Sequence, residues 1–145
     1  MEKYKITTAE NKGNFAIVAE GAGAVIRATT SDDNKVLFNA INGQGEKVKD
    51  NIGVELDVIN IVVTSADVAK DFSDRENADA EKVSKPCVHF FTADGRHISS
   101  ISSGIIRAVE KLFEADMQPV GGEVLRLMFT TVNTKNGTAH SFTLI

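Results

Sequence analysis

The alternation of apolar and polar residues in the first third of the chain predicts β-strands. Short apolar runs at Phe15–Glu20 and Ala24–Thr30 flank a Gly-Ala-Gly turn at residues 21–23, a pattern typical of a β-hairpin. Lys35–Ile41 also has the composition of a strand, and the glycine-containing segment 42–45 ends it. We therefore expect an N-terminal hairpin followed by a further strand.

The middle of the chain contains its longest β-branched run, Val54–Thr64. The first residues of this run alternate between apolar and charged, whereas the second half is apolar on both faces. The strand is therefore expected to begin at the surface and end in the core. A shorter strand is predicted at Cys87–Thr92, before an Ala-Asp-Gly turn. Within it Phe90 and Phe91 are adjacent, so their side chains must point to opposite faces.

One segment has the period of an amphipathic helix, beginning after a cap at Ser99 or Ser100. Its apolar stripe consists of Ile101, Ile105, Ala108, Val109, Leu112 and Phe113. Such a stripe predicts a helix that packs one face against a sheet. Gly104 lies within the helix, where we expect it to allow a strand to approach closely. Two further strands, Glu123–Val132 and Ala139–Leu144, flank a turn of the Asn-Gly type.

The order of strands, one helix and a final hairpin is that of an OB-fold. We therefore predict a mainly β protein, with a five-stranded barrel that carries its helix between the third and fourth strands. The N-terminal hairpin is expected to be an extension of this barrel. A length of 145 residues fits one OB-like domain spanning residues 1–145.

Residues 66–86 interrupt the apolar pattern with Ala, Asp, Glu, Lys and Ser, and end at Pro86. This composition, together with the proline, predicts a mobile acidic insertion with a helical turn around Ala66–Phe72.

Net charge limits the possible partners, because the chain carries a formal charge of −4. Strong, indiscriminate attraction to duplex DNA depends on clustered Lys and Arg, and is therefore not expected, although a local basic groove is compatible with this charge. The sequence contains no apolar run of membrane-spanning length and no signal peptide pattern, so we expect a cytoplasmic protein without membrane contact. Cys87 is the only cysteine and is predicted to be a buried thiol.

The motifs that would indicate an enzyme are missing. The glycines at residues 21–23 precede no predicted helix, and residues 43–47 lack the Ser or Thr of a phosphate-binding loop. The three histidines lie on different predicted elements and have no second cysteine beside them, so no metal site is expected. No serine stands in a glycine-flanked nucleophile motif. We therefore predict no catalytic residue, metal or cofactor.

Three motifs occur together around the single predicted helix. They are Lys35-Val36-Leu37-Phe38-Asn39-Ala40 with its glycine loop, Phe91-Thr92-Ala93-Asp94-Gly95 followed by Ile98-Ser99-Ser100-Ile101-Ser102, and Asn136-Gly137 before Ser141-Phe142-Thr143-Leu144. In this order, over residues 34–145, they resemble the single-stranded DNA-binding proteins of small protein-primed tailed bacteriophages. The resemblance implies a non-enzymatic protein of the host-cell cytoplasm that coats and protects displaced strands during viral DNA replication, with the replication machinery as a further partner. The family carries tyrosines around its binding strands, whereas this chain has only Tyr4.

Sequence-independent binding of single strands requires aromatic faces for the bases and cations for the phosphates. Seven residues are expected to provide them in this chain: Phe38 and Phe91 for stacking, and Arg27, Lys35, Lys47, Lys49 and Arg96 for the phosphates. Each phenylalanine also fits a position in the core.

Two other functions remain open at this point. One is a viral accessory or assembly module that uses the same barrel for contacts with proteins, which the acidic charge slightly favours. The other is a small enzyme on a β-barrel, for which the sequence offers no residues.

Overall fold

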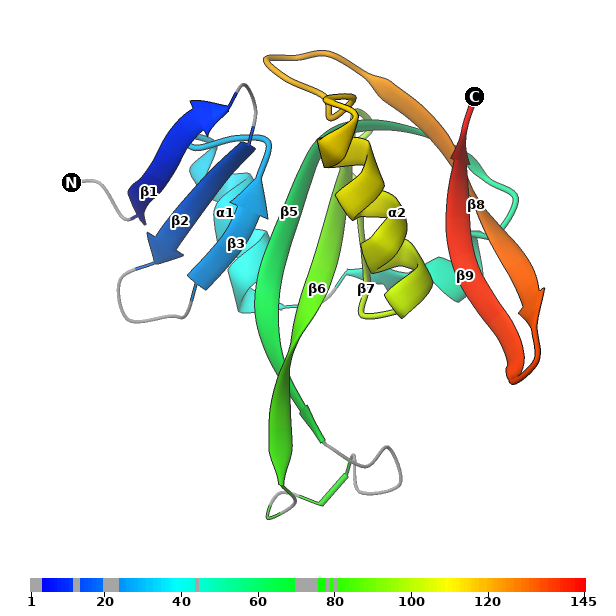
Figure 1. Cartoon of the computed structure of the whole chain (residues 1–145). Helices are drawn as coiled ribbons and strands as arrows, with labels where there is room; N and C mark the ends of the chain where they lie inside the picture. The colour runs from blue at the N-terminus through cyan, green and yellow to red at the C-terminus, as the bar shows by residue number, and fades with distance from the viewer. Residues whose placement is uncertain are drawn as a thin grey trace.

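Strands are the main secondary structure of the described residues, as the patterning predicts. A computed structural model describes residues 4–11, 14–19, 24–43, 45–69, 76–77, 79 and 81–145. The described elements, in chain order, are β1 (Tyr4–Asn11), β2 (Asn14–Ala19), β3 (Ala24–Ala28), α1 (Asn34–Asn42), β4 (Glu46–Lys47), the 3-10 helix η1 (Val48–Asn51), β5 (Glu55–Ala69), β6 (Lys82–Thr92), β7 (His97–Ser100), α2 (Ser103–Glu114), β8 (Leu125–Thr134) and β9 (Gly137–Leu144). The fold is mainly β, with two α-helices (Figure 1).

All nine described strands belong to one curled sheet in which β5 has a central position. The order is β1-β2-β3-β5-β6-β7-β4, and β8 joins at β5 and carries β9. Every pairing is antiparallel except that of β4 with β7. The predicted N-terminal hairpin is confirmed as β2 and β3, and the main helix does follow the third of the five strands β5 to β9. The structure has more elements than the seven strands (the hairpin and a five-stranded barrel) and one helix that were predicted, because β1, β4, β7 and α1 were not expected.

The segment Lys35–Ile41 is helical, so the prediction of a strand there is wrong. Asp33 caps the helix, since its carboxylate accepts a hydrogen bond from the Val36 backbone N–H at 3.2 Å. Leu37 and Ala40, three positions apart, are buried, whereas Phe38 between them is exposed. A short apolar run fits both the strand and the helix period, and here the cap and the packing decide in favour of the helix.

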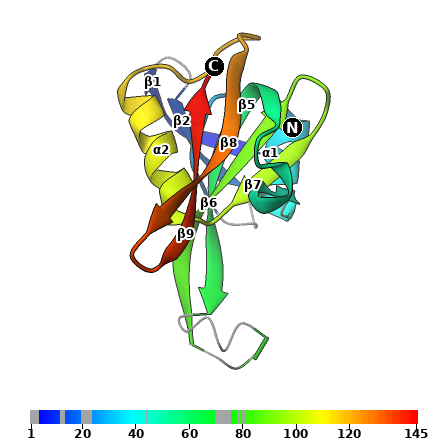
Figure 2. The same ribbon diagram turned by 90° about the vertical axis from the view of Figure 1, so that its right-hand side faces the viewer.

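Both ends of the predicted insertion at residues 66–86 belong to a long β-hairpin. The β5–β6 register continues to Ala69 opposite Lys82, so residues 66–69 and 82–86 are strand, and residues 66–69 do not form the predicted helical turn. The hairpin extends beyond the rest of the molecule (Figure 1, Figure 2). Exposed residues such as Ser65 and Ser84, whose hydroxyls are hydrogen-bonded to each other, give it the polar composition that obscured the strands. Asp71 and Phe72 lie outside the described residues, and the mobility of the segment stays a prediction.

The amphipathic helix is confirmed, but it begins at Ser103 rather than after Ser99 or Ser100. Residues 97–100 form β7 instead, because Ile98 pairs with Phe90 and is buried in the core. Gly104 has the predicted role: a Cβ atom at this position would lie 2.1 Å from the His140 carbonyl oxygen of β9. Neither described helix is long and apolar enough to cross a membrane.

Two apolar cores lie on opposite faces of β5 and β6. The larger core packs α2 against the inner face of the curled sheet, and the smaller packs α1 against the other face, as the positions of the two helices in Figure 2 show. Phe90 belongs to the larger core and Phe91 to the smaller. The prediction that these neighbours point to opposite faces is therefore confirmed, and both side chains are buried.

Candidate nucleic-acid interface

A polar hollow of about 440 Å³ lies among η1, β6, β7 and β9. Its lining comes from four parts of the chain: Lys47, Val48 and Lys49, then Cys87, then residues 99–102, and finally His140. Two lysines and three serines contribute cationic and hydroxyl groups, and no carboxylate is among the described lining residues. Such a surface suits a ligand with negatively charged oxygens, since ammonium and hydroxyl groups donate hydrogen bonds to them.

Strand β4 carries Lys47, and the 3-10 helix η1 that follows it directly carries Lys49. Lys47 pairs with Ser99 of β7, and the Gly45 N–H donates a hydrogen bond to the Ser99 hydroxyl at 2.8 Å. Gly45 also lies so close to β7 that a Cβ atom would be 2.2 Å from the His97 carbonyl oxygen. Val48 is buried in the larger core, which leaves Lys47 and Lys49 exposed on either side of it.

Arg96 lies beside this segment but is engaged by an acid. Its Nε and Nη2 atoms donate to the two carboxylate oxygens of Glu46 at 3.1 and 2.7 Å, and Nη2 also donates to the Asn51 side-chain oxygen. The hydrogen bond from Arg96 lowers the pKa of the Glu46 carboxyl, and the same bond raises the pKa of Arg96. The predicted cation is thus paired within the protein.

Phe91 is buried against α1 and stacks on His97. The His97 ring in turn reaches His89, with Nε2 of His97 2.8 Å from Nδ1 of His89, and His89 Nε2 lies 3.1 Å from the Thr64 hydroxyl. Burial, reinforced by the nearby charge of His97, lowers the pKa of His89 to about 4. Burial also lowers the pKa of His97. The face of Phe91 that a base would need is therefore occupied by protein.

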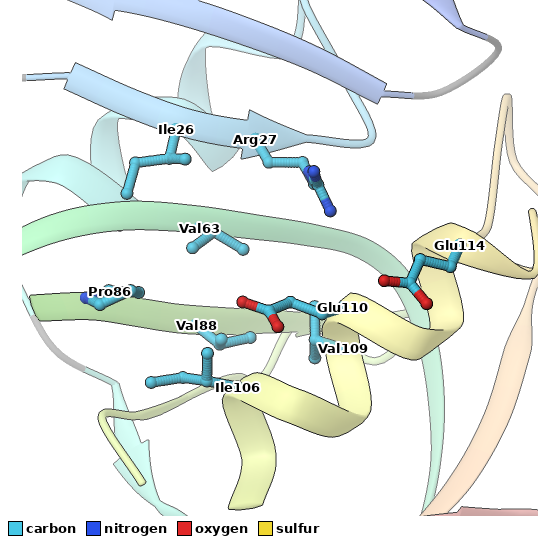
Figure 3. A pocket seen from close by; sticks show the side chains of 9 residues that line it. All are labelled: Ile26, Arg27, Val63, Pro86, Val88, Ile106, Val109, Glu110 and Glu114. Atoms are coloured by element: carbon cyan, nitrogen blue, oxygen red, sulfur yellow. The ribbon is translucent and has the colours of Figure 1, made fainter. Parts of the chain in front are cut away.

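Arg27 lies in a different hollow, of about 220 Å³, between β3 and α2 (Figure 3). Its guanidinium carbon is 5.0 Å from the centre of the Phe113 ring, and Glu110 and Glu114 share the lining. Val88 lines this hollow and its neighbour Cys87 lines the other, and adjacent strand residues point to opposite faces. The two hollows share no lining residue, so Arg27 is not part of the surface that carries Lys47 and Lys49.

Lys35 and Phe38 occupy the exposed side of α1, three positions apart and so on one face of the helix. The Phe38 side chain is 44% exposed, and among the phenylalanines whose side chains the structure describes it alone is exposed. Five of the seven predicted residues therefore fall into two regions. Lys47, Lys49 and Arg96 lie in or next to the polar hollow, Lys35 and Phe38 lie on α1, and Arg27 and Phe91 pack against other parts of the protein.

Sequence reasoning missed the hydroxyls and the histidine that complete the hollow. Ser99 and Ser100 were interpreted as helix caps, although four serines within five residues are an unusual concentration of hydroxyl groups. His140 has no comparable signal, because only the pairing of β9 with β8 brings it to this place. The prediction that Cys87 is buried is confirmed, and burial raises the pKa of its thiol.

Comparison with known proteins also indicates a partner with negatively charged oxygens, namely single-stranded DNA. The family model described as "Phage Single-stranded DNA-binding protein" matches residues 18–144, and so begins before residue 34, where the resemblance in the sequence begins. Separate comparisons with curated proteins and with solved structures gave no match. Members of this family are non-enzymatic proteins that bind single-stranded DNA. Because the match covers most of its length, the chain belongs to the phage single-stranded DNA-binding protein family.

Proposed function

We propose that this protein coats the displaced single strand during viral DNA replication, without sequence preference, and holds its phosphates at the polar hollow beside β7. The observation that carries this proposal is that Lys47 and Lys49 line the same hollow, whose described lining contains no carboxylate. In a chain with a formal charge of −4, two cations concentrated at one place mark the surface most suited to a phosphate backbone.

The strand topology supports this location. Strands β5 to β9 pair as β5–β6, β6–β7, β5–β8 and β8–β9, and α2 separates β7 from β8. These are the pairings of an OB-type barrel left open between its third and fifth strands, and OB-folds bind oligonucleotides on the face of strands two and three. In this chain those two strands are β6 and β7, which contribute Cys87, Ser99 and Ser100 to the hollow.

The bases require an aromatic face as well as the cations. We assign this role to Phe38, because its side chain on α1 is 44% exposed whereas that of Phe91 is buried. Lys35 lies on the same face of α1 and would neutralise a phosphate near the stacked base. We assign Arg27 and Phe91 to the packing of the fold and not to contacts with DNA.

Fluorescence titrations with oligo-dT, a mixed-sequence oligonucleotide and a duplex of the same length test this function. The proposal predicts similar affinities for the two single strands and much weaker binding to the duplex. A nuclease-protection assay at saturating protein should then show that the bound strand is shielded. Equal affinity for duplex, or no binding to either single strand at micromolar protein and low salt, would contradict the proposal. Such a result would favour the alternative, a module that binds proteins.

A further inference from the structure

We propose that Arg96, Glu46 and Asn51 form a clamp that holds Lys47 and Lys49 in place at the hollow. Arg96 is then a positioning residue rather than a phosphate contact. This inference rests on the proposed function, because it concerns how the two lysines are presented to DNA.

The contacts of Arg96 reach both ends of the lysine segment. Glu46 comes immediately before Lys47, and its carboxylate accepts two hydrogen bonds from the guanidinium, at 2.7 and 3.1 Å. Asn51, two residues after Lys49, accepts a third on its side-chain oxygen. The Asn51 amide nitrogen donates to the Lys47 carbonyl oxygen at 3.0 Å. One guanidinium therefore ties the start of the segment to its end.

The surroundings show why the clamp can fix a conformation. Asn51 is almost completely buried, with 3% of its surface exposed, so its amide cannot move away freely. The planar fork of an arginine sets the orientation of a carboxylate that it binds through two nitrogens. Arg96 directly precedes β7, the strand with which β4 pairs. A backbone segment fixed in this way loses little further freedom when its lysines bind a phosphate, which favours binding.

The charge balance is also consistent with the clamp. Glu46 compensates the charge of Arg96, so within this cluster Lys47 and Lys49 remain as the cations directed at the hollow. If Arg96 bound a phosphate through Nε or Nη2, it would have to leave Glu46 and Asn51, and the freed Glu46 carboxylate would then repel DNA. Loss of the Glu46 charge should therefore raise the affinity for DNA if Arg96 contacts a phosphate, and lower it if Arg96 positions the lysines.

The experiment compares Glu46→Gln with Asp50→Asn in titrations with oligo-dT at several salt concentrations. Asp50 is an exposed acid in the same segment and has no described hydrogen bond or ion pair, so it is a matched control for the loss of one negative charge. Its replacement should tighten binding by about twofold through charge alone. The clamp predicts that Glu46→Gln weakens binding by about three- to tenfold, because the lysines must then be ordered on binding. Both variants should keep the melting temperature, since exposed ion pairs contribute little to folding.

A charge swap completes the test. Arg96→Glu alone should weaken binding more than Glu46→Gln, and the double variant Glu46→Arg with Arg96→Glu should recover most of the loss by restoring the pair. Tighter binding of Glu46→Gln, similar to that of Asp50→Asn, would overturn the clamp. A Lys47→Ala/Lys49→Ala variant in the same titrations tests the proposed DNA site separately from the proposed clamp. If it binds like the unaltered protein, the proposed hollow is wrong, whereas weak binding of this variant together with tight binding of Glu46→Gln rejects the clamp alone.

Discussion

The ring of His97 lies stacked on the ring of Phe91, with centroids 4.5 Å apart and planes 16° from parallel. Phe91 is 7% exposed and belongs to the smaller core, which also contains Leu37, Val25 and Val62. The aromatic that the sequence places on the binding strand is thus already stacked within the protein. A base could take its place only by displacing His97 and opening the contact with α1.

Phe91→Ala should therefore act on folding rather than on DNA affinity. Removing a buried phenylalanine leaves a cavity between α1 and the sheet, which should lower the free energy of unfolding by about 3 kcal/mol or more. Urea unfolding followed by circular dichroism measures this loss. The folded fraction of the variant should bind oligo-dT with nearly unchanged affinity. A stable variant whose affinity is strongly reduced would mean that Phe91 contacts the bases.

Phe38→Ala should show the opposite behaviour. Because the side chain is 44% exposed on α1, its loss should change the free energy of unfolding by less than about 1 kcal/mol. If its ring stacks on a base, binding should weaken by about 1 to 3 kcal/mol while the salt dependence is retained. Phe38→Tyr keeps an aromatic face and is the matched control, with affinity close to that of the unaltered protein. Equal binding of the alanine and tyrosine variants would contradict the assignment.

The buried histidine predicts a loss of stability in acid. Burial lowers the pKa of His89 from 6.5 to about 4, so the folded protein holds this ring neutral while the unfolded chain takes up a proton. The contribution of His89 is therefore complete above pH 6.5 and is lost as pH falls towards 4, up to about 3 kcal/mol. Burial lowers the pKa of His97 too, which adds in the same direction. Urea unfolding between pH 7.5 and pH 4.5 gives the stability profile. Titration of the His89 ring by NMR with a midpoint near 6.5 would contradict this account.

The sequence predicted those elements that have a long hydrophobic repeat or a specific turn motif. Strand β5 and helix α2 are long enough for their periods to be unambiguous, and the Asn-Gly turn identified the last hairpin. Helix α1 was missed because seven mostly apolar residues fit both periods, and only packing of Leu37 and Ala40 against the sheet decides between them. The ends of β5 and β6 were missed because a hairpin with exposed polar side chains resembles a solvated segment.

The candidate site was predicted only in its charged part. Lys47 and Lys49 were recognisable as cations in a glycine-containing loop. Their surroundings depend on contacts between residues far apart in the sequence, such as Arg96 with Glu46 and Gly45 with Ser99. No local pattern encodes such pairs, which arise when β4 aligns with β7. For the same reason the sequence could not show that Arg27 lines a different hollow from the lysines.

The salt dependence of oligo-dT binding by Lys47→Ala/Lys49→Ala tests the central claim most directly. For single strands, the logarithm of the affinity falls with the logarithm of the salt concentration at a slope of about −0.7 for each phosphate contact. If both lysines contact phosphates at the hollow, the slope of the double variant should be shallower by up to about 1.4, with an unchanged melting temperature. The control Arg107→Ala/Lys111→Ala removes the same charge from the exposed side of α2 and should keep the original slope. An unchanged slope in the lysine variant, or an equal change in the control, would show that the strand is not held at this hollow.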